Sequence, residues 1–270
     1  MASKTFHFLS GLPRSGSTVL ASILSENPDI YVSASSPLVG LVHGAKHMWD
    51  TAEHTKAYFV PGQIERVLGG MLDSFYAHIE KPVVFDKNRA WANPQNQEML
   101  ALALGRQPKL VCTVRPIAPI LASFIALIRK NPVSTSFIDK ELLSVGQALT
   151  DENRCNLLMS ESGHVFQSWS VLRSGVETYR GNILFVEYDN LMTRPEYELR
   201  RIYAFLERPF FAHNLSNIIN PVLENDEKAY NMPGMHAVRP VLQKTAKDPR
   251  EILGQTLFDR YQGGEFWKNL

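Results

Sequence analysis

The segment FLSGLPRSGSTVL near the start of the chain has the glycine spacing of a phosphate-binding loop. Gly11 and Gly16 match the pattern G-x-x-x-x-G-K-[ST], but Ser17 stands at the lysine position and the basic residue, Arg14, lies inside the loop. Glycines let backbone N–H groups turn inward, and Ser17 and Thr18 can present hydroxyls and N–H groups to an anion at a helix start. The guanidinium of Arg14 can bind two oxygens at once. The segment therefore predicts a phosphate site, although a Gly/Ser turn with an exposed arginine has the same pattern.

Other polar side chains also stand where apolar runs end. Arg115 ends the run LVCTVR, and Ser123 lies eight residues further on, so the two can offer one charge and one hydroxyl to a second phosphate. Lys87 is near the end of KPVVFDKN, and Tyr188 is near the end of NILFVEYDNL. Each has a plainer explanation as well: a salt-bridged arginine, a serine facing solvent, an exposed lysine and a core tyrosine.

Short β-rich runs alternate with helical patterns along the whole chain. The expected strands cover residues 5–11, 29–34, 81–88, 109–116 and 182–191. The expected helices fall at 17–27, within 37–80, and at 94–105, 117–130, 153–180, 195–209 and 249–261, while 131–150 has no clear pattern.

This alternation predicts an α/β fold with three layers, P-loop-like, in which a central, mostly parallel sheet is flanked by helices. We expect a single domain over residues 1–270. Ligands of such sheets bind at the carboxyl ends of the strands, where Arg14, Lys87, Arg115 and Tyr188 are expected to meet.

The composition excludes several classes of protein. The net charge is +1, with 44% apolar and 20% charged residues, so no strong field points to nucleic acid or to a membrane surface. No apolar stretch reaches the length of a membrane span, and the start does not resemble a signal peptide. The two cysteines do not suggest a disulfide framework. These features predict a soluble, cytoplasmic protein.

Together the motifs resemble those of the sulfotransferase superfamily, whose members use 3′-phosphoadenosine 5′-phosphosulfate (PAPS). GLPRSGST resembles the family's 5′-phosphosulfate loop, and VRP with its later serine resembles the 3′-phosphate motif. DKNR (86–89) resembles the strand-end lysine element of several branches. FVEYDNLMTRP with RRIYAFL, and HAVRP (236–240), resemble the later segments that complete the nucleotide site. The motifs occur in the family's order and cover most of the chain.

The resemblance implies transfer of the sulfuryl group from PAPS to a hydroxyl or amine of a small-molecule acceptor, with release of the doubly phosphorylated nucleotide PAP. It implies in-line transfer without metal, with Lys87 and Arg14 as catalytic cations. The cofactor-binding residues that it implies are Arg14, Ser15, Gly16, Ser17 and Thr18 for the 5′ end, Arg115 and Ser123 for the 3′-phosphate, Tyr188 near the adenosine and Arg239 at a phosphate.

The general base does not follow from the resemblance. Cytosolic branches have histidine two residues after the strand-end lysine, where this chain has Arg89. Tyrosyl-protein branches have a glutamate pair after the second strand, where this chain has Ala34 and Ser35. We name His43 as the candidate base; Asp86, His47, Glu53 and His54 are the alternatives. Residues 37–60 and 131–155 are the expected walls of the acceptor site; the acceptor and the oligomeric state stay open.

Two other functions fit parts of the pattern. The first is a P-loop kinase or NTPase, against which stands the missing loop lysine. The second is a nucleotide-binding module without turnover, because no base has a clear position.

Overall fold

A computed structural model describes residues 4–132, 135–222, 224–243 and 247–270. Its centre is a five-stranded sheet in the order β2-β3-β1-β4-β5, and every neighbouring pair is parallel. The strands are β1 (Thr5–Gly11), β2 (Ile30–Ser35), β3 (Val83–Lys87), β4 (Leu110–Val114) and β5 (Ile183–Glu187). The predicted α/β fold with a mostly parallel sheet is thus confirmed.

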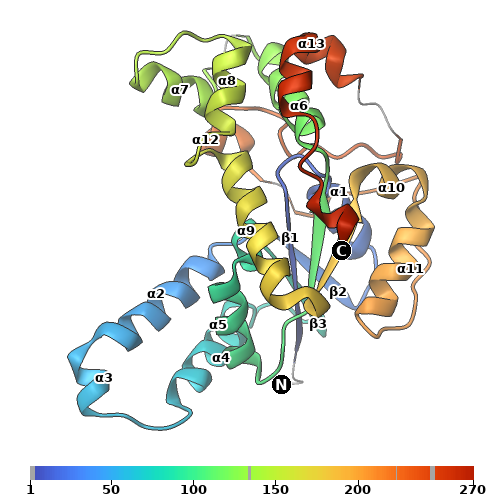
Figure 1. Cartoon of the computed structure of the whole chain (residues 1–270). Helices are drawn as coiled ribbons and strands as arrows, with labels where there is room; N and C mark the ends of the chain where they lie inside the picture. The colour runs from blue at the N-terminus through green and yellow to red at the C-terminus, as the bar shows by residue number, and fades with distance from the viewer. Residues whose placement is uncertain (1–3, 133–134, 223, 244–246) are drawn as a thin grey trace.

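Helices connect the strands and cover both faces of the sheet (Figure 1). The α-helices are α1 (Ser17–Ser25), α2 (Leu38–Thr51), α3 (Glu53–Ala57), α4 (Gln63–Phe75), α5 (Pro94–Leu104), α6 (Ile117–Lys130), α7 (Phe137–Ser144), α8 (Asp151–Leu158), α9 (His164–Tyr179), α10 (Tyr188–Thr193), α11 (Pro195–Phe205), α12 (Asp226–Tyr230) and α13 (Pro249–Tyr261). The 3₁₀ turns of the described residues are η1 (Arg89–Ala92), η2 (Arg180–Asn182) and η3 (Phe266–Asn269).

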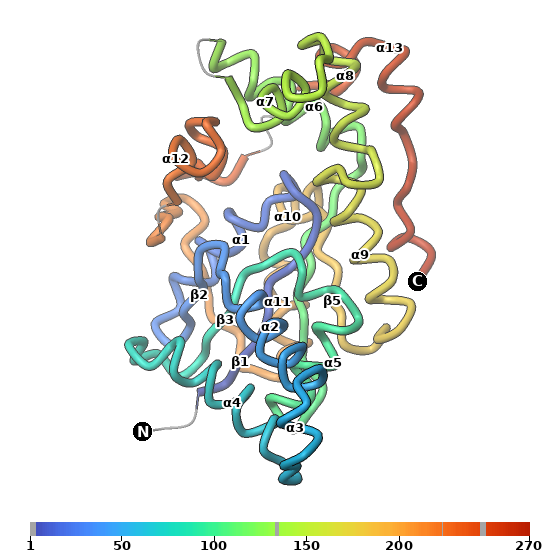
Figure 2. Tube along the Cα trace, turned by 90° about the vertical axis from the view of Figure 1, so that its left-hand side faces the viewer, coloured from blue at the N-terminus to red at the C-terminus, as the bar shows by residue number. Residues whose placement is uncertain are grey.

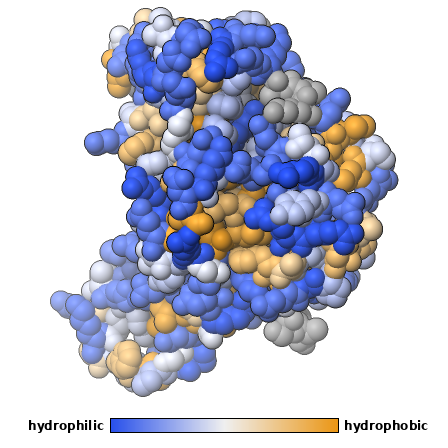
Figure 3. Space-filling view, turned by 45° about the vertical axis from the view of Figure 1, so that its right-hand side comes forward, coloured by the Kyte–Doolittle hydropathy of each residue, from blue (hydrophilic) through white to orange (hydrophobic). Residues whose placement is uncertain are grey.

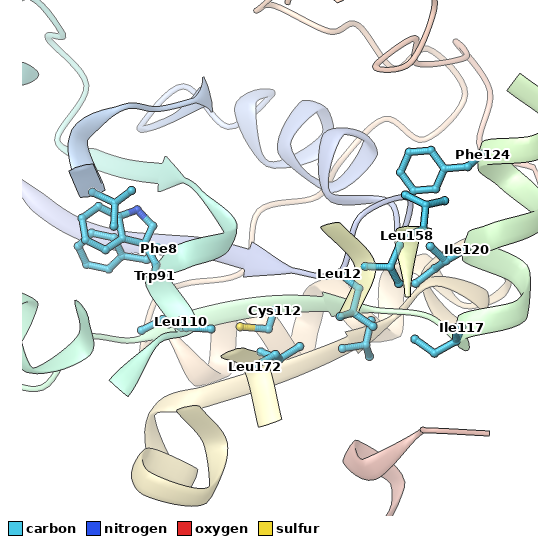
Figure 4. Close-up of a cluster of buried hydrophobic side chains, with 14 of the residues drawn as sticks. Phe8, Leu12, Trp91, Leu110, Cys112, Ile117, Ile120, Phe124, Leu158 and Leu172 are labelled. Atoms are coloured by element: carbon cyan, nitrogen blue, oxygen red, sulfur yellow. The ribbon is translucent and has the colours of Figure 1, made fainter. Parts of the chain in front are cut away.

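Two hydrophobic cores lie on opposite faces of the sheet, because successive side chains of a strand point to opposite sides. On β4, Leu110, Cys112 and Val114 belong to the larger core with residues of α2, α4, α5, α6 and α9, whereas Val111 belongs to the second core with α1 and α11. Figure 4 shows part of the larger core, in which Cys112 and Leu172 lie between strand and helix. The inner strands β1, β3 and β4 are therefore buried almost completely on both faces, whereas several side chains of the outer strands β2 and β5 are only partly buried.

Two predicted elements were wrong. Residues 153–180 form two helices, α8 and α9, because the chain turns sharply at Gly163, where a Cβ would lie 2.2 Å from the Leu157 carbonyl oxygen. The fifth strand ends at Glu187, and Tyr188 already begins α10. The second difference matters for the site, since it turns the Tyr188 ring onto the first loop.

The two ends of the sheet differ in their surroundings. Figures 1 and 2 place the chain's amino terminus at one end of the molecule, while α6, α7, α8, α12 and α13 gather around the other. Helices α2 and α3 project away from the sheet. The face in Figure 3 is mostly hydrophilic, with one apolar area near its middle. None of the described helices combines the length and the apolar character needed to cross a bilayer.

The strands bring their carboxyl ends to one edge. The register pairs Lys87 with both Leu9 and Ser35, Gly11 with Thr113, and Val114 with Glu187. The strands therefore end at similar heights, and the loop after each strand begins at this edge of the sheet. The predicted site residues come from these loops.

Candidate active site

A cavity of about 910 Å³ lies over the carboxyl edge of the sheet. Most of the residues expected to bind PAPS line it: Arg14, Gly16, Ser17, Thr18, Lys87, Arg115, Ser123, Tyr188 and Arg239. Its volume is at the upper end of the range for small-molecule sites, roughly 300–1,000 Å³, so a nucleotide and a small acceptor could share it. The structure thus gathers side chains from four loops and from a late segment, residues 224–239, into one cavity.

The first loop, residues 11–17, has a conformation that its glycines make possible. Gly11 has φ +129°, and a Cβ there would lie 2.1 Å from the carbonyl oxygen of Thr113 on β4. Gly16 has φ +91°, and a Cβ would lie 2.9 Å from the Tyr188 ring. Both positions therefore need glycine, one to pack against the neighbouring strand and one to leave room for Tyr188.

Arg14 turns its side chain into the cavity from a left-handed backbone conformation, with φ +57°. Non-glycine residues adopt such angles at a cost of order 1–3 kcal/mol, so the surroundings must hold it there. Its Nε donates to Ser123 Oγ at 3.1 Å, and its Nη1 donates to the carbonyl of Met235. Burial, followed by the nearby charge of Arg115, lowers its pKa. Two neighbouring guanidinium groups favour the binding of an anion between or beside them.

Arg115 is buried and incompletely hydrogen-bonded. Its Nη1 donates to the carbonyl of Arg14 at 3.3 Å, and its guanidinium carbon lies 4.2 Å from the centroid of the Tyr188 ring. Its Nε is buried and has no hydrogen-bond partner in the described part of the chain. A buried donor without a partner costs about 1–3 kcal/mol, which a phosphate oxygen would recover. The residues present therefore fit a nucleotide with two anionic ends.

Ser15 differs from the other predicted loop residues because its side chain points into the protein. The hydroxyl lies 2.7 Å from Thr113 Oγ1 and donates to the Leu12 carbonyl. The side chain is fully buried and does not line the cavity. Any part that Ser15 has in anion binding falls to its backbone N–H.

Lys87 ends β3 at the cavity, and its ammonium group is already paired. Its Nζ lies 2.9 Å from Glu224 Oε1, and both side chains are almost completely buried. The same Glu224 oxygen accepts from the backbone N–H of Ser35 at 2.8 Å and from the Ser35 hydroxyl at 3.2 Å. A carboxylate thus occupies the end of β2, where the sequence has no acidic residue, because the late segment brings it there.

Glu224 belongs to a cluster with Asp226 and His236 that the sequence analysis did not identify. His236 Nδ1 lies 2.5 Å from Asp226 Oδ1 and 2.9 Å from Glu224 Oε2, and the His236 backbone N–H donates to Asp226 Oδ2 at 2.7 Å. Burial favours a higher pKa for Glu224, but its bonds with His236, Lys87 and Ser35 outweigh burial and lower it. His236 lines the cavity, whereas Glu224 and Asp226 stand behind it.

The three ligand atoms of this cluster lie within 4.8 Å of one another, a spacing that a metal ion could bridge. Here a positive charge is already present, because the Lys87 ammonium group contacts one Glu224 oxygen, and the Nδ1 atom of His236 faces both carboxylates. We therefore interpret the cluster as an ion-pair network. The sequence gives only a weak indication of this cluster, namely an E-x-D pair and a histidine shortly before VRP. These residues lie 189 positions or more after Ser35 in the chain.

The other predicted bases lie elsewhere. His43 is exposed on α2, as are His47 on the same helix and Glu53 and His54 on α3, and none of them lines the cavity. Asp86 is buried and accepts from Tyr76 Oη at 2.5 Å and Trp91 Nε1 at 2.6 Å, and burial raises its pKa. It holds η1 against the sheet.

The expected acceptor walls also lie elsewhere. Among the described residues, the cavity lining includes none from 37–60 or 131–155. The side of the cavity next to Lys87 is instead lined by Ser35, Asn88, Arg89 and Tyr230.

Comparisons with known proteins identify the family and the fold of the chain. The family model described as "Sulfotransferase family" matches residues 8–212. The curated proteins contain no match. Among solved structures, mouse sulfotransferase SULT7A1 complexed with PAP is similar, with 16% identity, a TM-score of 0.51 and coverage of 96% of this chain and 84% of that chain.

Two further solved structures have the same degree of similarity. A sulfotransferase from Alicyclobacillus acidocaldarius is 15% identical with a TM-score of 0.50, covering 82% of this chain and 88% of that chain. A sulfotransferase domain from the curacin biosynthetic pathway is 15% identical with a TM-score of 0.50, covering 96% of this chain and 90% of that chain. At such identities the similarity shows the fold.

Proposed function

Because the chain belongs to the sulfotransferase family, an enzyme family that uses PAPS, we propose that it transfers the sulfuryl group of PAPS to a hydroxyl or amine of a small-molecule acceptor and releases PAP. The observation that carries this proposal is the meeting of Arg14, Arg115 and Lys87 in one cavity, with a donor of Arg115 buried and unpartnered. We further propose that residues 1–270 act as one domain, in the cytoplasm.

Each anionic end of the nucleotide has its own set of residues in this proposal. The 5′ end binds to the backbone N–H groups of the first loop and to the hydroxyls at the start of α1, where the helix dipole favours an anion. These residues are Arg14, Ser15, Gly16, Ser17 and Thr18, with Ser15 contributing its backbone alone. The 3′-phosphate binds to Arg115 and Ser123, the adenosine lies near Tyr188, and Arg239 reaches a phosphate.

PAPS supplies an activated sulfuryl group, and the protein supplies the charge that stabilises the leaving phosphate. Arg14 and Lys87 are the proposed catalytic cations, and losing one such donor costs about 2.7–4 kcal/mol of transition-state stabilisation in comparable sites. Lys87 is held in place by Glu224, so its ammonium group is oriented before the substrates arrive. Arg14, Arg115 and Lys87 together bring the positive charge that magnesium brings to P-loop phosphates, and we therefore propose a reaction without metal.

We propose His236 as the general base in place of His43. Its Nδ1 faces Asp226 and Glu224, so in the neutral ring that nitrogen carries the proton and Nε2 keeps its lone pair. No described residue bonds to Nε2, and the ring lines the cavity. Glu224 is the weaker candidate, because a carboxylate with a lowered pKa has little tendency to take a proton at neutral pH. Asp226 and Glu224 are positioning residues.

Calorimetry and a transfer assay test the function. PAP should bind equally well with magnesium and with EDTA, and purified protein should then move ³⁵S from labelled PAPS to members of an acceptor panel. Binding of ATP that requires magnesium, with no binding of PAP, would indicate the P-loop kinase or NTPase. Tight binding of PAP with no transfer to any acceptor would indicate a nucleotide-binding module without turnover.

A further inference from the structure

We propose that Arg89 binds a carboxylate of the acceptor, so that the enzyme acts on hydroxy or amino acids in preference to their neutral relatives. This inference rests on the proposed sulfuryl transfer and names the class of acceptor. It starts from the position two residues after the strand-end lysine, where this chain has a guanidinium.

A rigid turn presents Arg89 to the cavity. The residue opens η1, in which Asn88 Oδ1 accepts from the Ala90 N–H at 2.9 Å. The Arg89 carbonyl accepts from Ser10 Oγ at 2.8 Å, and Trp91 of the same turn donates to the buried Asp86. The backbone of Arg89 is therefore tied to β1 and β3, and its side chain lines the cavity.

The guanidinium of Arg89 differs from the cationic groups of Lys87, Arg14 and Arg115, because it bonds to none of the residues that the structure describes. Lys87 pairs with Glu224, Arg14 donates to Ser123, and Arg115 donates to the Arg14 carbonyl. The side chain of Arg89 donates no hydrogen bond to any residue that the structure describes. Burial lowers its pKa, and Tyr230 and Glu224 offset this only electrostatically. A half-buried guanidinium without a carboxylate gains most from an anionic ligand.

Its neighbours place this charge on the acceptor side. Arg89 lies close enough to Tyr230 and to His164 to act on the pKa of each, whereas Arg14 and Arg115 are next to each other at the first loop. The Tyr230 ring centroid lies 5.8 Å from that of His236, the proposed base. An acceptor whose carboxylate binds Arg89 would thus have its hydroxyl held near His236 and Lys87.

The charge balance favours a carboxylate over a phosphate. One guanidinium matches one negative charge and binds a carboxylate through two parallel hydrogen bonds. The carboxylates of Glu224 and Asp226 lie near the same side, and a doubly charged phosphate would be repelled by them more strongly.

The test compares hydroxy acids with their methyl esters as acceptors of ³⁵S from PAPS, for the natural chain and for Arg89→Gln. Benzoate and benzamide, titrated against the PAP-saturated protein, give a readout that does not depend on turnover. Arg180→Gln is the matched control, because it removes one exposed positive charge at the far end of α9. The affinity for PAP is measured for every variant.

We expect kcat/KM for the acids to exceed kcat/KM for their esters by about tenfold to a hundredfold. This ratio corresponds to the free energy of one charge-assisted hydrogen-bonded pair. Arg89→Gln should remove this preference and the binding of benzoate, and keep the PAP affinity within about twofold; Arg180→Gln should change none of these. Equal use of acids and esters, or a preference that survives Arg89→Gln, would overturn the assignment while leaving sulfuryl transfer intact. A large loss of PAP affinity in Arg89→Gln would place Arg89 in the nucleotide site and overturn it also. Failure of the natural chain to bind PAP at all would instead overturn the proposed function.

Discussion

The first loop (residues 11–17) and the late segment (residues 224–239) meet at the same cavity but are held there by different forces. The first loop is fixed by backbone geometry: Gly11 packs on Thr113, and the Leu12 N–H donates to the Thr113 carbonyl at 2.9 Å. The late segment is fixed mainly by charge, through the Lys87–Glu224 pair and the contacts of His236 with Asp226. A substitution that adds a Cβ against a neighbouring strand is tolerated less well than one that changes an ion pair. The reason is that the backbone of a packed strand cannot move aside.

This difference agrees with the different tasks that we propose for the two regions. A phosphate is the same in every PAPS molecule, so a stiff backbone cradle suits it. The proposed acceptor side is built from side chains that reach across the molecule, and these can change without disturbing the sheet. Substitutions in the first loop should therefore affect folding, and substitutions in the late segment should affect turnover.

The largest effect should come from Gly11→Ala. The new Cβ would lie 2.1 Å from the Thr113 carbonyl oxygen at a φ of +129°, so β1 and β4 must separate. We expect a loss of more than about 4 kcal/mol of unfolding free energy, or no folded protein. Urea denaturation measures it, with Gly44→Ala as the control, since nothing lies within 4 Å of a Cβ there. That helical position should gain about 0.5–1 kcal/mol. Equal stability of the two variants would contradict the role of backbone geometry.

His236→Gln should leave the fold intact and lower kcat by about 10²–10⁴-fold, the usual contribution of a general base. The affinity for PAP, measured by calorimetry, should stay within a factor of about two. Asp226→Asn should lower kcat less, because the ring keeps its place through Glu224. The matched control is His43→Gln on the exposed face of α2, which should have the activity of the natural chain. Full activity of His236→Gln would remove it as the base.

Arg115→Ala should weaken PAP by about 10- to 100-fold, since it removes charge-assisted hydrogen bonds to one phosphate. Adenosine 5′-monophosphate, which lacks the 3′-phosphate, should lose little. Calorimetric titration of both nucleotides gives the ratio directly. If both lose affinity to the same extent, Arg115 does not recognise the 3′ end.

The smallest effect should be a pH dependence of stability that arises away from the cavity, at His7. Burial, followed by the charges of Arg106, Arg208 and Lys109, lowers the pKa of His7 to about 3. The unfolded chain, with a histidine pKa near 6.5, binds a proton that the folded chain does not. The free energy of unfolding should therefore fall below pH 6.5, by up to about 1.4 kcal/mol per pH unit and about 2 kcal/mol by pH 5. His7→Phe should flatten this slope in denaturation at pH 7, 6 and 5, whereas His47→Gln, on the surface, should not. An unchanged slope in His7→Phe would assign the acid sensitivity to other groups.

The sequence by itself determined the order of the strands and helices along the chain and predicted most of the residues that line the proposed cofactor half of the cavity. Both depend on interactions between residues close in the chain: apolar periodicity, glycines that permit positive φ, and polar residues directly after a strand. The sequence did not predict the helix break at Gly163 or the strand end at Glu187. The helical and apolar patterns continue across these two positions, and only tertiary packing ends the helix or strand there.

Only the tertiary structure brought together the residues of the proposed base and of the proposed acceptor side. Glu224 reaches Ser35 across 189 residues, and Asp226 and His236 are brought to Lys87 by the path of the late segment. No local pattern encodes such contacts, because an ion pair depends on where two side chains finish in space and not on their spacing in the chain. For the same reason the sequence shows only that Arg89 stands where other branches of the family have histidine. That its guanidinium bonds to no described residue became visible only in the tertiary structure.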